Sequence, residues 1–244
     1  MFMYRRFLLV VAALVVVAVI GVGTGPAQAQ DDEVESDDSL QTACSNGTAV
    51  PNPGANPGLV ADCVALLTAK QTLKASPALN WSADTAISKW RGVGIFKKRV
   101  YYVQLRGLSG EIHPALGRLS ALDTLGLEHN SLTGEIPAEL ANLPELRHLF
   151  LQYNQLTGEI PSELGSMAQL ELIHLQGNRL TGEIPVELAN LRMLIYLWLS
   201  DNQLTGEIPA ELGSLSKLKF LSLSSNQLAG RYPPNWAASP NWRC

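Results

Sequence analysis

Several protein classes are excluded by what this 244-residue chain has little of. Three cysteines are too few for a disulfide-built miniprotein and are not spaced as a zinc site. The net charge of −4, without clustered Lys and Arg, argues against a nucleic-acid-binding surface. The chain has no nucleophile elbow, Walker loop, HExxH motif or kinase signature, so we expect no enzyme, no cofactor and no metal. Disorder throughout is excluded by the 46% of hydrophobic residues.

Residues 1–29 are typical of a secretory signal peptide. Arg5 and Arg6 precede an unbroken apolar run over residues 7–20, and Ala27-Gln28-Ala29 supplies the small residues of a cleavage site. An uncleaved membrane anchor is the alternative, but the run is shorter than the ~20 residues of a spanning helix. We therefore expect cleavage after Ala29 and a secreted or cell-surface chain without a membrane span.

Residues 30–58 are predicted to be a flexible tether. Residues 31–38 read DDEVESDD, and residues 44–58 are rich in Asn, Pro and Gly. Such a segment has too little apolar surface to offset the entropy of ordering its backbone.

Residues 59–97 are predicted to form an N-terminal cap. A helix that starts at Pro57 would place Cys63 and several leucines on one face, with Trp81 and Trp90 as filler. Cys44 and Cys63 are the predicted disulfide, in keeping with an oxidising compartment. Cys244 could then pair between chains, stay free or belong to a degenerate C-terminal cap.

A 24-residue period organises residues 98–230. Four full repeats begin at Leu122, Leu146, Leu170 and Leu194, and degenerate ones precede and follow them. In each repeat, LxxLxL predicts a short strand, the Pro of LTGEIP ends the extended segment, and ELxxL predicts a short helical segment. One coil cannot bury its leucines alone, so stacked coils should share a continuous core, with a parallel sheet on the concave side. Residues 231–244 form a C-terminal tail.

One asparagine recurs where each strand bends. Its amide can pair with backbone groups of neighbouring coils, and an unpaired buried polar group would cost ~1–3 kcal/mol. We therefore predict a structural ladder of Asn130, Asn154, Asn178, Asn202 and Asn226.

These repeats resemble leucine-rich repeats of the plant type, LxxLxLxxNxLTGxIP, over residues 100–230. The preceding segment resembles the N-terminal cap of plant receptor ectodomains at Asp62, residues 65–67, 80–81 and 90–93. It departs from that cap at Ile87 and Ile95, which stand near the positions where a Cys pair usually lies. The resemblance implies a right-handed α/β solenoid with a concave parallel sheet and a helical cap. It further implies the short ectodomain of a receptor-like kinase or receptor-like protein, here without a kinase domain.

The candidate site is the solvent-facing side of the concave sheet, where the repeats differ from one another. Contiguous exposed aromatic side chains usually mark a binding surface, although they could instead pack on one another to cover the sheet. The predicted partner-binding residues are Phe150, Tyr153, Tyr196, Trp198, Phe220, His129, His148 and His174. His148 and His174 would lie diagonally ~7–8 Å apart without an obvious carboxylate or Cys, which favours contact with a partner over a metal site. Protonation of these histidines could then make binding pH-sensitive.

Two rows of glutamate should follow the flank of the solenoid. They are most simply solvated, with calcium or a basic partner as the alternative. The rows are Glu111, Glu135, Glu159, Glu183, Glu207 and Glu139, Glu163, Glu187, Glu211. Asn46 and Asn80 also fit the glycosylation pattern.

These features predict a secreted or cell-surface binding module that recognises a protein, peptide or glycan on its concave face. Three alternatives stand beside this prediction: an inhibitor of secreted polysaccharide-degrading enzymes, as some plant proteins of this repeat type are, a non-specific envelope spacer, and a hydrolase hidden in the cap. The sequence names neither the ligand nor the oligomeric state.

Overall fold

The computed structural model describes residues 36–75 and 78–229. The elements below all belong to one compact unit of the chain. The predicted signal peptide, the tail at 231–244 and Cys244 lie outside the described residues. Within residues 36–75 and 78–229, no helix has the length and apolar character needed to cross a bilayer.

The flexible tether predicted for residues 30–58 is wrong over its described part, residues 36–58. Helix α1 (Asp37–Cys44) begins after Ser36, whose hydroxyl accepts a hydrogen bond from the backbone N–H of Ser39. A 3₁₀ turn, η1 (Pro53–Ala55), follows, and Leu40, Ala49 and Val50 are all buried. The composition argument failed because these few apolar residues are placed against a core that the rest of the chain supplies.

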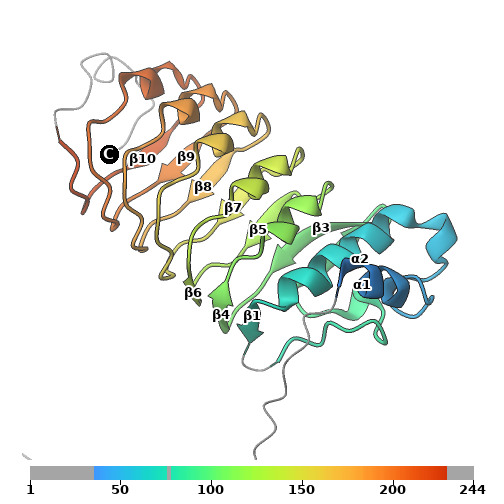
Figure 1. Ribbon diagram of the computed structural model, residues 1–244. Helices are drawn as coiled ribbons and strands as arrows, with labels where there is room; N and C mark the ends of the chain where they lie inside the picture. The colour runs from blue at the N-terminus through green and yellow to red at the C-terminus, as the bar shows by residue number, and fades with distance from the viewer. Residues whose placement is uncertain (1–35, 76–77, 230–244) are drawn as a thin grey trace, which may run out of the picture. The chain divides into compact units, whose positions relative to one another are not determined.

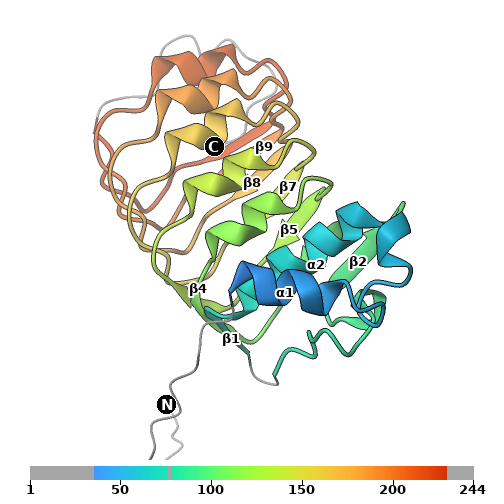
Figure 2. The ribbon, with the colours of Figure 1, turned by 45° about the vertical axis from the view of Figure 1, so that its right-hand side comes forward.

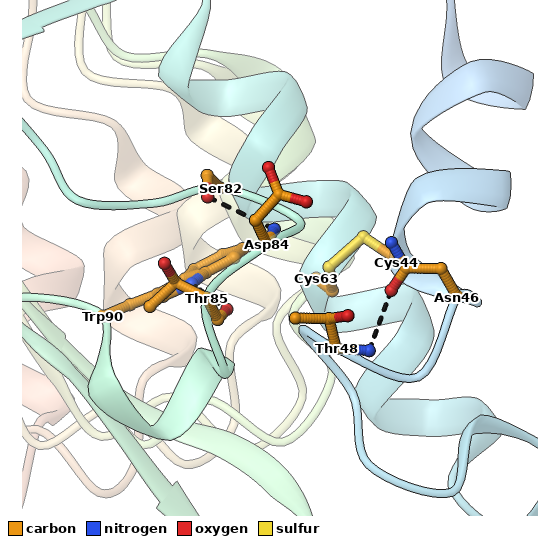
Figure 3. The surroundings of a disulfide bond; sticks show 8 residues. All are labelled: Cys44, Asn46, Thr48, Cys63, Ser82, Asp84, Thr85 and Trp90. Carbon is orange, nitrogen blue, oxygen red and sulfur yellow. Dashed lines mark hydrogen bonds between the residues drawn. A yellow bond between two sulfur atoms is a disulfide. The ribbon is translucent and has the colours of Figure 1, made fainter.

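The predicted disulfide between Cys44 and Cys63 is present and joins the last residue of α1 to the middle of α2 (Pro57–Lys70). Figure 3 shows the bond between the two helices, with Trp90 on the other side of Cys63. Trp81 and Trp90 are both buried and stack with ring centroids 5.8 Å apart. Their indole N–H groups donate to the backbone carbonyls of Arg91 and Thr85, so the cap filler is fully hydrogen-bonded.

A buried ion pair fixes α2 to the sheet. The Asp62 carboxylate has no exposed area and accepts two hydrogen bonds from the Arg99 guanidinium, at 2.9 and 2.7 Å. It also accepts the backbone N–H of Val100 at 2.8 Å. The carboxylate holds the pKa of Arg99 above its usual value. The pair therefore sets the position of the first long strand against the cap.

The coils stack through a seven-stranded sheet in the order β10-β9-β8-β7-β5-β3-β2 (Figure 1). All neighbours are parallel except the hairpin of β2 and β3. Its strands are β2 (Val93–Phe96), β3 (Arg99–Gln104), β5 (Thr124–Gly126), β7 (His148–Phe150), β8 (Leu172–His174), β9 (Tyr196–Trp198) and β10 (Phe220–Ser222). Leu125 pairs with Leu149, one period of 24 residues away, whereas Val103 pairs with Leu125 two residues short of that period. The irregular first repeat predicted from the sequence is thus accommodated within the sheet.

Short 3₁₀ segments form a second row beside the strands, one per coil (Figure 2). They are η3 (Pro114–Arg118), η4 (Ala138–Asn142), η5 (Ser162–Ser166), η6 (Val186–Asn190) and η7 (Ala210–Ser214). The proline of GEIP precedes each of the last four in an extended conformation, as at Pro137, where φ is −63° and ψ 129°. The cap adds η2 (Ile87–Lys89), and α2 packs against η3, which closes the N-terminal end of the core.

A smaller sheet of three strands lies on the other edge of the first coils, in the order β1-β4-β6. The strands are β1 (Leu73–Ala75), β4 (Leu108–Glu111) and β6 (Ser131–Thr133). Gly158 shows why the LTGEIP motif needs a glycine. Its φ is +74°, and an added Cβ would lie 2.8 Å from the Glu135 side chain. Only glycine meets both conditions without strain.

The asparagine ladder forms as predicted. Asn154, for example, donates from Nδ2 to the carbonyls of Leu127 and Leu151, at 2.8 and 3.0 Å. Its Oδ1 accepts the backbone N–H of Leu132 at 3.0 Å. The same arrangement recurs at the other four ladder asparagines, so the ladder ties each coil to the one before it.

Candidate functional site

A continuous line of aromatic rings crosses the concave sheet from β7 to β10. His148 and Phe150 have centroids 6.1 Å apart, and Phe150 meets His174 edge to face at 5.1 Å. His174 then contacts Trp198 at 5.4 Å, and Trp198 stacks on Phe220 at 4.5 Å with 24° between the ring planes. We call these five residues the aromatic ladder. The sheet pairs Phe150, His174 and Trp198 in register at one solvent-facing strand position, whereas His148 and Phe220 occupy the other solvent-facing position of their strands and close the line at its two ends.

Two large side chains stand beside the ladder without belonging to it. Tyr196 on β9 exposes 37% of its surface, and Leu172 on β8 is partly exposed. Both occupy the strand position of His148 in their own coils, and they pair in register. Together with the ladder they make an apolar strip along four neighbouring strands.

Tyr153 and His129 do not join the ladder. They follow the strands at the bend, where φ is +57° and +55°, and their rings stack with centroids 4.6 Å apart. The Tyr153 ring lies over Gly177 of the next coil, where an added Cβ would come within 2.6 Å of it. The eight predicted residues therefore divide into the ladder, Tyr196 and this pair at the rim.

The N-terminal end of the face is polar. Glu128 is only 6% exposed, and its Oε1 accepts hydrogen bonds from Gln104 at 2.8 Å and Arg106 at 3.1 Å. Tyr102 completes the group through a hydrogen bond to Gln104. The other carboxylate oxygen of Glu128 is buried without a partner among the described residues. This cluster was not predicted from the sequence, because Tyr102, Gln104 and Arg106 all come from the irregular first coil.

A charged group occupies the row beside the ladder. Arg147 lies between Asp123, at 3.5 Å, and Glu171, at 3.3 Å. Asp123 also accepts the Thr124 hydroxyl at 2.8 Å and lies 3.5 Å from Nδ1 of His148. Alternating charges one coil apart satisfy each other, so this row leaves little net charge beside the apolar strip.

The histidines do not assemble a metal site. Within residues 36–75 and 78–229, no group of three or more His, Cys, Asp or Glu side chains is placed to hold an ion. Burial between Phe150 and Trp198 lowers the pKa of His174, which keeps the imidazole neutral and apolar in character. His174 therefore contributes to the strip as a ring.

The glutamate rows lie outside the seven-stranded sheet, with Glu111 as the last residue of β4 in the smaller sheet. A shallow groove of about 680 Å³ is lined there by side chains that include Glu159, Glu183 and Glu207. These three carboxylates are exposed, in keeping with a solvated stripe. Of the two glycosylation motifs, Asn80 is structurally engaged: its amide donates to Lys89 O at 2.9 Å and accepts Arg91 N–H at 2.6 Å.

Comparison with known proteins identifies the repeat. The family model described as Leucine Rich Repeat matches residues 121–143, 145–167 and 169–191, and the model described as Leucine Rich repeats (2 copies) matches residues 192–230. No curated protein matches the chain.

Several solved structures are similar to this chain. The BIR2 ectodomain from Arabidopsis thaliana is 34% identical with a TM-score of 0.63, and the match covers 73% of this chain and 97% of that one. PEPR1 in the PEPR1–AtPEP1 structure is 32% identical with a TM-score of 0.69, covering 75% of this chain and 27% of that one. The ectodomain of the Arabidopsis receptor kinase HAESA, solved with an N-terminally extended IDA peptide hormone ligand, is 30% identical with a TM-score of 0.59, and the match covers 74% of this chain and 36% of that one. The chain thus spans about a quarter of PEPR1 and a third of HAESA, but nearly all of BIR2.

Proposed function

The chain belongs to the leucine-rich repeat family, and on that premise we propose that it is an extracellular binding module, without catalysis, that captures a peptide or an extended protein segment on its concave sheet. The aromatic ladder is the observation that carries the proposal. The solenoid is held together by its leucines and asparagines, so nothing in the stacking of coils calls for five rings on the opposite side of the sheet.

The shape of the strip favours a polypeptide ligand. Trp198 and Phe220 each have one ring face covered by the other, so those two faces are not available to the flat face of a sugar. The side chains of Leu172 and Tyr196 beside them suit apolar side chains of a polypeptide. Four strands at a spacing of about 4.8 Å span about 14 Å, which matches about four residues of an extended chain.

The extracellular location rests on two further observations. The disulfide between Cys44 and Cys63 forms and persists in an oxidising compartment. The similar solved structures include ectodomains of the Arabidopsis receptor kinases SOBIR1 and HAESA, the latter with a peptide hormone ligand. The predicted signal peptide at residues 1–29 agrees with both.

A displayed random-peptide library tests the proposal. Peptides enriched on the wild-type protein should bind Tyr196→Glu at least ten times more weakly, because the substitution puts a charge into the apolar strip. Val186→Glu is the matched control, since Val186 is 46% exposed and lies on η6. Equal affinity of the two variants would overturn the concave-face assignment.

Peptide enrichment and a hydrolase assay with the same protein distinguish the proposal from its alternatives. An inhibitor would slow a secreted polysaccharide hydrolase, and the Tyr196→Glu variant would slow it less. A spacer would enrich no peptide and inhibit no hydrolase. Either result would replace the proposal of peptide capture.

A further inference from the structure

The turn between β2 and β3 has an unusual composition. Its two residues are Lys97 and Lys98, with φ of +46° and +62°. A two-residue turn with both φ values positive is normally built from Asn and Gly, because other side chains are strained in the left-handed region. Backbone strain of this kind is tolerated where the side chains serve a purpose. The sequence thus places two lysines at a position where stability alone would not select them.

Two exposed aromatic residues flank these lysines. Phe96 exposes 57% of its surface and Tyr101 42%, and their ring centroids are 5.7 Å apart. The Lys97 ammonium lies 5.3 Å from the centre of the Phe96 ring. The hairpin tip, residues 96–101, is therefore an exposed apolar pair with two cations beside it. It is separate from the aromatic ladder, because β2 is the edge strand of the sheet at the opposite end from β10 (Figure 2).

The charge of the tip is opposite to that of the whole chain. The next cation along the chain, Arg99, is neutralised by Asp62, which leaves the charges of Lys97 and Lys98 at the tip. The chain as a whole carries −4, with nine glutamates on the flank of the coils. An anionic surface would therefore be repelled by the flank and attracted by the tip.

We propose that the hairpin tip docks on an anionic lipid bilayer. Exposed aromatic rings next to lysines are the chemistry of the membrane interface, where rings enter the headgroup region and cations meet anionic lipids. The tip offers four residues, Phe96, Lys97, Lys98 and Tyr101, far fewer than the ~20–30 residues per side of a stable protein interface. A bilayer requires no complementary shape, so a small convex tip suffices. The proposal is independent of the ligand on the concave sheet.

The direct test uses the full chain with vesicles of phosphatidylcholine alone or with 30% phosphatidylglycerol. Hydrogen exchange of residues 93–103 reads out the tip itself, and the tip variants below leave the apolar run at residues 7–20 unchanged, so a difference between variants comes from the tip. The tip amides should be protected by the anionic vesicles and not by the neutral ones. Lack of protection by anionic vesicles, or equal protection by both, would overturn the proposal.

Variants assign the effect to the lysines. The double variant Lys97→Asn, Lys98→Gly should bind anionic vesicles about 30-fold more weakly, which corresponds to about 1 kcal/mol for each lysine. It should fold at least as stably as wild type, because Asn-Gly suits this turn, so weaker binding would not reflect unfolding. Phe96→Ser should weaken binding to the anionic vesicles, because the phenyl ring then no longer enters the headgroup region. Lys74→Asn on β1 is the matched control with unchanged binding.

An acidic protein partner is the competing occupant. Soluble polyglutamate should protect the tip much less than anionic vesicles do, because it has no apolar layer for Phe96 to enter. Protection by polyglutamate without protection by vesicles would reassign the tip to a protein partner. If anionic vesicles bound wild type and the lysine double variant equally, the tip would not be the part of the chain that binds the membrane.

Discussion

Replacing ladder asparagines by alanine tests how the coils are held together. Asn178 accepts the Leu156 N–H at 3.1 Å and donates to the carbonyls of Leu151 and Leu175, both at 3.0 Å. Each of these carbonyls has a second donor, since Leu151 O also receives Asn154 and Leu175 O also receives Asn202. The ladder is therefore redundant at its carbonyls but not at its N–H groups.

This difference sets the magnitudes. Asn178→Ala leaves one buried N–H without its partner, at about 1–3 kcal/mol, and weakens two carbonyl contacts, so we expect a loss of about 2–3 kcal/mol in the free energy of unfolding. Asn154→Ala should cost about the same. The double variant should cost about 1–2 kcal/mol more than the sum, because the Leu151 carbonyl then loses both of its donors.

Asn154→Ala with Asn202→Ala is the matched control. These two asparagines share no carbonyl, since Asn154 donates to Leu127 and Leu151, and Asn202 to Leu175 and Leu199. Their costs should add to within about 0.5 kcal/mol.

Guanidinium chloride unfolding, followed by circular dichroism and by tryptophan fluorescence, measures the three single variants, Asn154→Ala, Asn178→Ala and Asn202→Ala, and the two double variants. Coincident transitions by the two probes are required, because repeat proteins can lose coils separately. If the adjacent pair is as additive as the separated pair, the shared carbonyl does not couple neighbouring coils and the reasoning is refuted.

Arg99→Met should lower the free energy of unfolding by about 3–5 kcal/mol, because it leaves the Asp62 carboxylate buried without its counter-charge. Asp62→Ala should cost less, since the Arg99 side chain that it leaves unpaired is 29% exposed, whereas Asp62 has no exposed area. Chemical denaturation of both variants checks this order. Replacing Cys44 and Cys63 by serine should lower the free energy of unfolding by about 3 kcal/mol, as expected for a cross-link with a sequence separation of 19. An unfolding midpoint of the wild-type protein that does not change when reductant is added would contradict this. Burial lowers the pKa of His174, so the unfolded chain binds its proton more readily than the folded one. Stability present above about pH 6.5 should therefore fall as the pH drops through the lowered pKa, and thermal melts of His174→Phe should show a smaller fall.

The repeat made most of the fold predictable. A fixed period fixes which residues face inward, so the buried leucines and the asparagine contacts follow from counting along the chain. The prediction of a flexible tether failed over residues 36–58 because the folding of this segment depends on partners far along the sequence. Asp37 is an example: it forms an ion pair with Arg118, and its pKa is lowered by that hydrogen bond. Local composition carries no trace of such a partner.

The candidate site was predictable in membership but not in contacts. Counting places Phe150, His174 and Trp198 at one strand position, and the sheet pairs them in register. Whether the rings stack or splay depends on side-chain rotamers, which periodicity does not determine. The same limit applies to the β2–β3 hairpin: the sequence shows Lys97 and Lys98, while the positive φ values appear only in the structure.

Contact between the rings changes how the binding face has to be tested. If the rings of the strip only faced solvent, alanine at Phe150, Tyr196 and Trp198 would remove binding and leave thermal unfolding nearly unchanged. Trp198 contacts both His174 and Phe220, so Trp198→Ala removes two ring contacts at about 0.5–1.5 kcal/mol each and loses stability together with binding. Tyr196 is 37% exposed and lies beside the ladder, so its replacement separates the two effects. A Tyr196→Ala variant that melts as early as Trp198→Ala would show that the strip is part of the core after all, and that its rings hold the sheet rather than a ligand.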